Sequence, residues 1–264
     1  MASESYSLGV SDGEQARLHR QRELYGDTAG IEFSSTDVVC EIGSGVGANL
    51  WIAKQVARGR YVGIDVEPKQ NEVAAKRAWA MGLKNTELRT ASGDNTGLPD
   101  GGVDATFCRC VLIHQPDPTP LIAEMCRITK LGGRIIISEP HDASYHSGPD
   151  KTHLMKCLRA RSHYAYGDGR GSPEVALNLY PLLIRQGVRD IRVTPHVISV
   201  HGREPERCRA FLQNWLGIIA TVADSLLEVG AVSERDLDLA AAEAEDITAN
   251  TFLYQSMWIA EAIK

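Results

Sequence analysis

The sequence has no long apolar run, no dense cluster of basic residues and no pair of cysteines spaced as C-x-x-C. The most apolar candidate for a membrane span, residues 211–232, is interrupted by polar and charged side chains, so we expect no membrane segment. The first 30 residues are polar and charged, unlike a secretory signal peptide. These absences favour a cytoplasmic protein.

Charge and metal-binding patterns narrow the function further. Acidic residues outnumber basic ones by 34 to 28, whereas a nucleic-acid-binding protein usually carries a basic face, so we expect no nucleic-acid partner. No H-E-x-x-H motif or Cys/His cluster is present, which predicts no metal site. The six cysteines are best interpreted as small buried hydrophobic residues in a reducing compartment.

A glycine-rich stretch, residues 38–47, is the most informative part of the chain. Its first three residues are apolar and β-prone, glycines follow at positions 43, 45 and 47, and a helical pattern begins at Asn49. This order predicts a strand, a tight turn and a helix start. Glycine suits such a turn because the backbone adopts conformations that a Cβ would forbid, and because a ligand can lie close to the main chain.

Strands and helices are expected to alternate over residues 36–140, which predicts a parallel sheet with helices on both faces. In such a sheet, ligands bind beyond the carboxyl ends of the strands, where strand order reverses. A polar loop is expected at 141–150. We predict strands at 37–42, 60–65, 86–91, 103–110, 133–139, 190–198 and 254–263, and helices at 47–57, 69–81, 117–129, 150–164, 174–186, from 205 to about 229, and from a cap at Ser233 to about 249.

Acidic residues mark the predicted carboxyl ends of the strands. Glu41 precedes the first glycine by two residues, Asp65 ends the second strand, and Asp94 and Asn95 follow the third strand region. An acid at the position of Asp65 can accept hydrogen bonds from both hydroxyls of a ribose. Gln70, one helical turn later, can reach the same ribose, and the alternative is that it is an exposed residue at the start of a helix. The glycines alone also satisfy a loose dinucleotide-binding pattern, so the neighbouring acids must discriminate.

Together these residues resemble the class I S-adenosylmethionine-dependent methyltransferases, in particular those acting on small, specialised metabolites. The resemblance covers roughly residues 36–140. It implies that Glu41 orients the methionine amino group through water, that Gly43 and Gly45 carry the methionine portion, that Asp65 holds the ribose and that Asp94 reads the adenine amino group. The resemblance also places Asn95, Arg109 and Cys110 beside S-adenosylmethionine.

The same resemblance implies the architecture of the whole chain. It predicts an α/β fold with a seven-stranded Rossmann-like sheet whose last strand is antiparallel, plus a helical cap between strands six and seven. The cap could instead be a dimerisation or packing element, and a homodimer is left open. The expected divisions are an N-terminal arm or lid at 1–35, the cofactor-binding domain at 36–200, the helical cap at 201–250 and the final strand at 251–264.

The N-terminal arm resembles the segment that closes over the cofactor in small-molecule methyltransferases. On this interpretation Tyr6 contacts substrate and Gln21 contacts cofactor. The alternative is a solvated helix that only packs on the sheet.

Candidate catalytic and substrate residues follow from the chemistry of methyl transfer. The cofactor already carries an activated methyl group, so the protein mainly aligns a nucleophile and excludes water. A hydroxyl acceptor usually needs a base, for which His141 is the first candidate and His114, which also suits a structural role, is the second. The expected substrate-binding residues are Tyr145, His146 and Tyr164, besides Tyr6.

Three functional hypotheses remain open at this point. The first is a methyltransferase acting on N, O or C of a small molecule, because the Asn/Asp-Pro-Pro-Tyr signature of enzymes that act on DNA bases or glutamine is missing. The second is an S-adenosylmethionine-binding protein with other chemistry, such as a cyclase. The third is a nicotinamide-dependent dehydrogenase, against which Glu41, the Gly93–Asp94 pair and the final strand argue.

Overall fold

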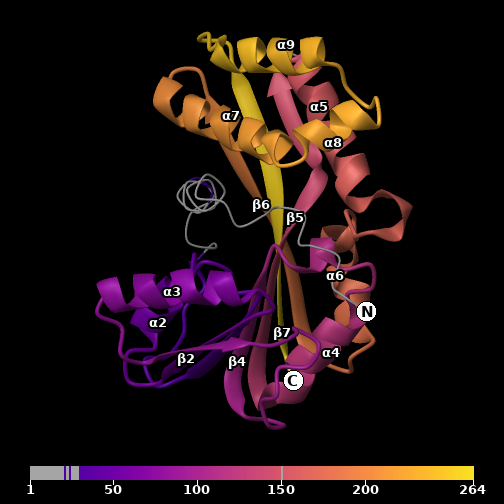
Figure 1. The fold of residues 1–264 in the computed structure, drawn as a ribbon. Coiled ribbons are helices and arrows are strands. Elements are labelled where there is room, and N and C mark those ends of the chain that lie inside the picture. Colours follow the sequence, from indigo (N-terminus) through magenta and orange to yellow (C-terminus); the bar gives the residue numbers. More distant parts are fainter. Residues whose placement is uncertain (1–20, 22–23, 25–29, 150) are drawn as a thin grey trace. The chain divides into compact units, whose positions relative to one another are not determined.

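The computed structural model describes residues 21, 24, 30–149 and 151–264 (Figure 1). The described strands are β1 (Val38–Ile42), β2 (Arg60–Asp65), β3 (Thr86–Thr90), β4 (Val103–Arg109), β5 (Thr129–Gly148), β6 (Arg189–His201) and β7 (Phe252–Ile263). The described α-helices are α2 (Trp51–Gln55), α3 (Pro68–Ala80), α4 (Thr119–Ile128), α5 (Thr152–Tyr166), α6 (Val175–Ile184), α7 (Pro205–Ala220), α8 (Ala223–Glu228) and α9 (Glu234–Glu245).

The strands form one seven-stranded sheet in the order β3-β2-β1-β4-β5-β7-β6. β1 pairs in parallel with β2 and β4, and the outer pairs β2–β3 and β4–β5 are also parallel. β7 lies between β5 and β6 and is antiparallel to both. This confirms the predicted α/β fold with an antiparallel last strand, and α7, α8 and α9 separate β6 from β7 in the sequence as predicted.

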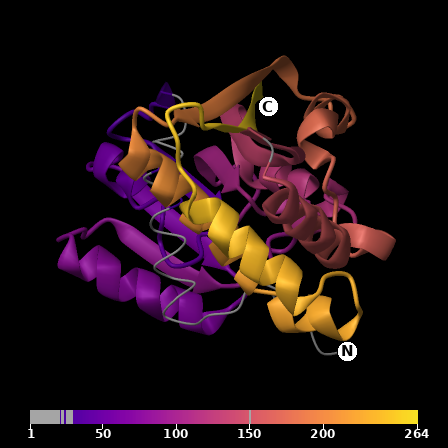
Figure 2. The ribbon, with the colours of Figure 1, turned by 90° about the horizontal axis from the view of Figure 1, so that it is seen from above.

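The chain divides into two compact units, and both are discontinuous in sequence. Among the described residues, the α/β unit comprises 30–141, Glu174–His196 and Met257–Lys264. The helical unit comprises 142–149, 151–173 and Val197–Ser256. Strands β5, β6 and β7 therefore contribute residues to both units. Within the helical unit, α5 and α9 lie side by side (Figures 1 and 2).

The core of the α/β unit is built from the central parallel strands. Most of their side chains are buried, and accordingly most residues of β1 and more than half of those of β4 are apolar. Tyr61 and Phe107 are the largest fully buried side chains of this core. The core therefore fixes the strand ends at which the acidic residues lie.

The structure corrects the expected helix at 47–57, because α2 covers only Trp51–Gln55. The residues before it form turns, and Gly47 has a φ of 74°. A Cβ on Gly47 would lie 2.9 Å from a Leu50 methyl carbon, so the glycine allows the chain to turn tightly at this point. The glycine turn is therefore longer than its sequence pattern indicated.

Two other boundaries were also wrong. The polar loop expected at 141–150 continues β5 as far as Gly148, because this segment pairs with β7 and the Ser144 hydroxyl accepts a hydrogen bond from Ser256 N at 2.8 Å. The helix expected from 205 to about 229 is divided into α7 and α8. The Thr221 hydroxyl donates to the Ile218 carbonyl at 2.7 Å, and Val222 leaves the helical conformation with a φ of −132°.

Candidate functional site

The glycine turn after β1 is tied to the end of β2. Gly43 and Gly45 have φ values of 73° and 51°, in the left-handed region that favours glycine. The backbone N–H groups of Gly43 and Ser44 donate to the Ile64 carbonyl at 2.8 and 3.0 Å. Gly45 N donates to Asp65 Oδ2 at 2.8 Å. The structure therefore brings the predicted turn and the predicted ribose-binding acid together.

Asp65 keeps hydrogen-bonding capacity for a ligand. Its Oδ2 accepts the backbone N–H of Gly45 at 2.8 Å, its Oδ1 accepts that of Glu67 at 2.9 Å, and a carboxylate has about four acceptor positions. Burial raises the pKa of Asp65, and the backbone N–H groups counteract the shift. The remaining acceptor positions suit the two hydroxyls of a ribose.

Gln70, at the start of α3, has an unpaired buried oxygen beside the same turn. Its side chain is buried, and Oε1 has no hydrogen-bond partner among the described residues. A Cβ on Gly45 would lie 3.2 Å from this oxygen. Buried polar atoms are nearly always paired, so this acceptor fits a ligand that donates a hydrogen bond.

Glu41 belongs to a buried polar cluster. One oxygen accepts from Asn49 Nδ2 at 2.6 Å and the other accepts from the Tyr61 hydroxyl. Asn49 Oδ1 in turn accepts from Arg109 Nη1 at 3.2 Å and from Trp51 Nε1 at 3.3 Å. Burial raises the pKa of Glu41 to about 7, although its hydrogen bonds from Tyr61 and Asn49 lower it.

Sequence reasoning missed Asn49 and Tyr61. Asn49 links Glu41 to Arg109, and a polar residue at the first buried position after the glycine turn is the signal that could have identified it. Tyr61 lies in an apolar strand and carries no such signal, because its partner Glu41 is brought close only by β1–β2 pairing.

The loop after β3 holds the two residues expected at the adenine. Asp94 and Asn95 are both exposed, and Asp94 Oδ1 accepts a hydrogen bond from the Ser92 hydroxyl. The loop lies next to the end of β2, because Ala91 N donates to the Asp65 carbonyl at 3.1 Å. Both residues are therefore available at the edge where Asp65 lies.

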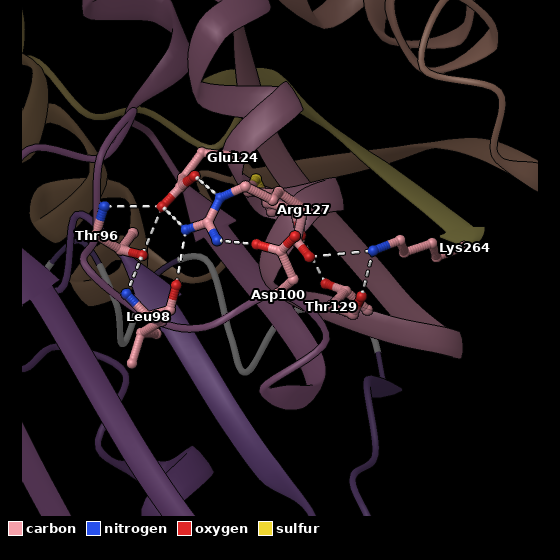
Figure 3. Close-up of polar contacts among 8 residues, drawn as sticks. Thr96, Leu98, Asp100, Glu124, Arg127, Thr129 and Lys264 are labelled. Atoms are coloured by element: carbon pink, nitrogen blue, oxygen red, sulfur yellow. Dashed lines mark hydrogen bonds and ion pairs between the residues drawn. The ribbon is translucent and has the colours of Figure 1, made fainter.

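This loop is anchored by α4 (Figure 3). Thr96 donates to Glu124 Oε1 from its backbone N at 2.8 Å and from its hydroxyl at 2.6 Å. Although burial raises the pKa of Glu124, hydrogen bonds from Arg127 and Thr96 lower it to about 2. Lys264 Nζ extends this network by donating to the carbonyls of Arg127 and Thr129 at 3.1 and 2.7 Å.

The end of β4 has an unusual backbone conformation. Cys110 has a φ of 56°, which residues other than glycine seldom adopt. Its N–H donates to the Ser138 carbonyl of β5 at 3.0 Å. Arg109, immediately before it, points its guanidinium to Asn49 of the Glu41 cluster. Both predicted residues thus belong to the region that contains the glycine turn.

Glu139, near the middle of β5, was also missed by sequence reasoning. It is fully buried, and its oxygens accept the backbone N–H groups of Val111 and Leu112 at 2.9 Å and of Ile113 at 3.3 Å. Burial raises its pKa to about 7, against these hydrogen bonds. An acid two residues after the apolar run 135–137 is the sequence signal that could have identified it.

The two predicted catalytic histidines lie in the α/β unit. His141 Nε2 is 3.7 Å from Glu174 Oε2, and the imidazole is partly exposed. His114 ends the short 3-10 helix Leu112–His114 that follows β4. Neither arrangement establishes a catalytic role.

The predicted substrate residues that the structure describes lie in the helical unit. The Tyr145 ring meets Trp215 edge-on at 5.3 Å, His146 stacks on Tyr254 at 4.9 Å, and the Arg170 guanidinium lies 5.1 Å from the centre of the Tyr164 ring. Gln21 is a partly buried helical residue. Tyr6 lies outside the described residues.

Two classes of feature were sought in the described part of the chain. Among residues 21, 24, 30–149 and 151–264, no group of three or more His, Cys, Asp or Glu side chains could hold a metal ion. None of the described helices is long and apolar enough to cross a membrane.

Comparison with known proteins gives one family match and several relatives. The profile of a family described as "Methyltransferase domain" matches residues 33–168, more than half of the chain. An uncharacterized methyltransferase of Mycobacteroides abscessus is 27% identical over 183 residues, covering 68% of this chain and 70% of that protein. Aklanonic acid methyltransferase DauC of Streptomyces sp. (strain C5) is 34% identical over 104 residues, covering 39% of this chain and 47% of that protein.

Solved structures share the fold at low sequence identity. Phosphoethanolamine N-methyltransferase 2 of Haemonchus contortus, in complex with phosphomonomethylethanolamine and S-adenosylhomocysteine, has a TM-score of 0.55 and 15% identity, covering 95% of this chain and 53% of that chain. The [4+2]-cyclase SpnF has a TM-score of 0.54 and 16% identity, covering 99% of this chain and 85% of that chain. At these identities the likeness concerns the fold alone.

Proposed function

The chain belongs to the methyltransferase-domain family, and from this premise we propose that it transfers a methyl group from S-adenosylmethionine to N, O or C of a small molecule. The observation that carries the proposal is the joining of the glycine turn to Asp65, with the unpaired oxygen of Gln70 beside it. This arrangement offers acceptors for ribose hydroxyls and a backbone against which a ligand can lie.

The residues of the α/β unit suit distinct parts of this cofactor. Asp65 and Gln70 accept hydrogen bonds from the ribose, and Asp94 accepts one from the adenine amino group. The glycine turn holds the methionine portion, and Arg109, linked through Asn49 to Glu41, supplies a positive charge for its carboxylate.

When bound, S-adenosylmethionine supplies an activated methyl group, so the protein's task is mainly alignment and exclusion of water. For a hydroxyl acceptor, His141 is proposed to remove the proton, with Glu174 3.7 Å away to orient the imidazole. His114 is the second candidate base. Tyr6, Tyr145, His146 and Tyr164 stay proposed substrate contacts, and Gln21 a proposed cofactor contact.

A small-molecule acceptor is supported by the relatives. DauC is named for aklanonic acid, and the Haemonchus enzyme was solved with phosphomonomethylethanolamine. The acidic net charge of −6 points in the same direction, because it disfavours nucleic acid. The proposal includes a cytoplasmic location and leaves a homodimer open.

The experiment is calorimetric titration with S-adenosylhomocysteine. The wild type is expected to bind in the micromolar range, and Asp65→Ala is expected to lose about 2 kcal/mol or more, roughly a 30-fold loss of affinity. Glu72→Ala, which removes an exposed carboxylate from α3, is the matched control and should bind like the wild type. A folded wild type that does not bind would refute the proposal.

A second candidate is non-methylating chemistry with the same cofactor bound, which the fold likeness to the cyclase SpnF favours. Incubation with S-adenosylmethionine and a panel of amines and phenols separates the two candidates. Formation of S-adenosylhomocysteine with a methylated product supports methyl transfer. Conversion of a substrate without consumption of cofactor supports the second candidate. Family membership argues against the nicotinamide-dependent dehydrogenase.

A further inference from the structure

The turn after β4 has a conformation that needs external support. Cys110 has a φ of 56°, and a residue with a Cβ stays in this region only when its surroundings hold it there. The hydrogen bond from Cys110 N to the Ser138 carbonyl holds Cys110 against β5 at the start of the turn. The next three N–H groups then need acceptors of their own, because this part of the chain is largely buried.

Glu139 supplies those acceptors. Its Oε1 accepts from Val111 and Leu112, and its Oε2 accepts from Ile113. Three consecutive backbone N–H groups therefore converge on one carboxylate from the neighbouring strand. Hydrogen bonds to an ionised acceptor are the stronger kind, so this side chain restrains the turn more than a neutral group would.

The turn after β4, which Glu139 restrains, packs against the glycine turn after β1. A Cβ added to Gly43 would lie only 2.2 Å from Val111 Cγ2, which shows that the Val111 side chain packs directly on the Gly43 backbone. Glu139 holds the N–H of this same valine. A displacement of the turn after β4 would therefore free the glycine turn on that side.

We propose that Glu139 is a positioning residue for cofactor binding: it holds the turn after β4 so that Val111 supports the glycine turn at Gly43. The inference rests on the proposed function, because it takes the glycine turn as part of the cofactor-binding site. Glu139 acts through Val111, because both of its carboxylate oxygens are engaged by backbone N–H groups of the turn.

The choice of substitution at Glu139 depends on the charged and titratable groups near it. Arg109 and the buried thiol Cys108, both on β4, interact electrostatically with it. Glu139→Gln removes the charge at nearly constant volume. The amide N–H₂ of the glutamine would face a backbone N–H, so at least one of the three hydrogen bonds is lost.

The experiment compares Glu139→Gln with Asp104→Asn. Asp104 lies on the neighbouring strand β4 and likewise accepts a backbone N–H, from Val38 at 2.7 Å, but it is near the end of β4 that is away from the turn at 110–113. S-adenosylhomocysteine affinity is measured by calorimetry at pH 7.5, and amide hydrogen exchange is measured at residues 111–113. Glu139→Gln should bind about tenfold more weakly and exchange faster at these amides, whereas Asp104→Asn should match the wild type in both.

Each outcome decides the proposal. Affinity in Glu139→Gln within about twofold of that in Asp104→Asn would overturn it, whether or not exchange is faster, because the turn would then not matter for binding. If Glu139→Gln does not fold, Glu139→Asp, which keeps the charge on a shorter side chain, is measured in the same way and should show the same two effects in weaker form. Absence of binding by the wild type would refute the proposed function instead, and exchange at residues 111–113 would then decide alone whether Glu139 holds the turn.

Discussion

At the scale of single residues, the α/β unit leaves a buried acceptor unpaired where a ligand is proposed. Gln70 Oε1 has no partner among the described residues, and an unpaired buried polar atom costs stability. Binding sites commonly trade stability for function in this way. Removing this oxygen should therefore raise the free energy of unfolding and lower the affinity for the ligand.

Gln70→Met tests this trade. The substitution removes the unpaired oxygen at similar length, so we expect the free energy of unfolding to rise by about 1 kcal/mol while S-adenosylhomocysteine affinity falls about tenfold. Urea denaturation and calorimetry measure the two effects. The matched control is Gln55→Met, because Gln55 Oε1 accepts from Phe33 N at 2.8 Å: this variant should lose stability and keep its affinity. A destabilised Gln70→Met with unchanged affinity would contradict the prediction.

The sequence was informative for residues that lie at strand ends and less so for their partners. Asp65 and the glycines were expected together from their order in the chain, and the structure joins them. The partners of Tyr61 and Glu139 could not be assigned in this way, even though an acid after an apolar run marks Glu139, because only sheet pairing brings each partner close. Roles of this kind arise in three dimensions and leave little trace in the order of residues.

At the scale of elements, α5 and α9 of the helical unit close each other's ends. Lys151, the residue before α5, is buried and donates from Nζ to the carbonyls of Glu243 and Asp246 at 2.5 and 2.7 Å. In return, the Glu243 carboxylate accepts the N–H groups of His153 and Leu154 at 3.2 and 2.9 Å. Each helix thus satisfies backbone groups that the other leaves open.

Lys151→Met should therefore destabilise the helical unit strongly. It removes a buried ammonium group that donates to two backbone carbonyls, and we expect the free energy of unfolding to fall by about 2–3 kcal/mol in urea denaturation. Lys156→Met is the matched control on the same helix, since Lys156 is half exposed and forms an ion pair with Asp236 at 2.8 Å. Such exposed pairs contribute about 0–1 kcal/mol. Equal losses in the two variants would show that the buried capping bonds have no special weight.

Element boundaries were predictable where apolar runs were continuous. The central strands β1, β2 and β4 lie close to their expected ranges for this reason. The extension of β5 to Gly148 was not predictable, because its polar residues pair with a strand more than 100 residues later. The division of the predicted helix into α7 and α8 at Thr221 depends on one side-chain hydrogen bond, so it was not predictable from the sequence either.

At the scale of the whole molecule, two buried carboxyls make stability depend on pH. Burial raises the pKa of both Glu41 and Glu139 to about 7, whereas an unfolded glutamate titrates near ~4.3. Between these values the native state binds more protons than the unfolded state, so the free energy of unfolding falls as pH rises. The lowered pKa of Glu124, about 2, acts only below this window.

We therefore expect the free energy of unfolding to decrease by roughly 1–3 kcal/mol between pH 5 and pH 7.5. Urea denaturation at several pH values measures the slope. Glu139→Gln should show about half of the decrease, because only one of the two buried carboxyls, Glu41, is then left. A wild type whose stability is constant or rises over this interval would rule out raised pKa values for these two groups.

The position of β7 also has a consequence for the order of events during synthesis. β7 is the last strand of the sheet to leave the ribosome, yet it occupies the place between β5 and β6. The two older strands must wait, with their facing backbone groups in water, until Phe252–Ile263 arrives. While α7, α8 and α9 are being translated, the edges of β5 and β6 that will face β7 therefore have no partner strand. We expect a chaperone to be most useful until β7 pairs with these two edges.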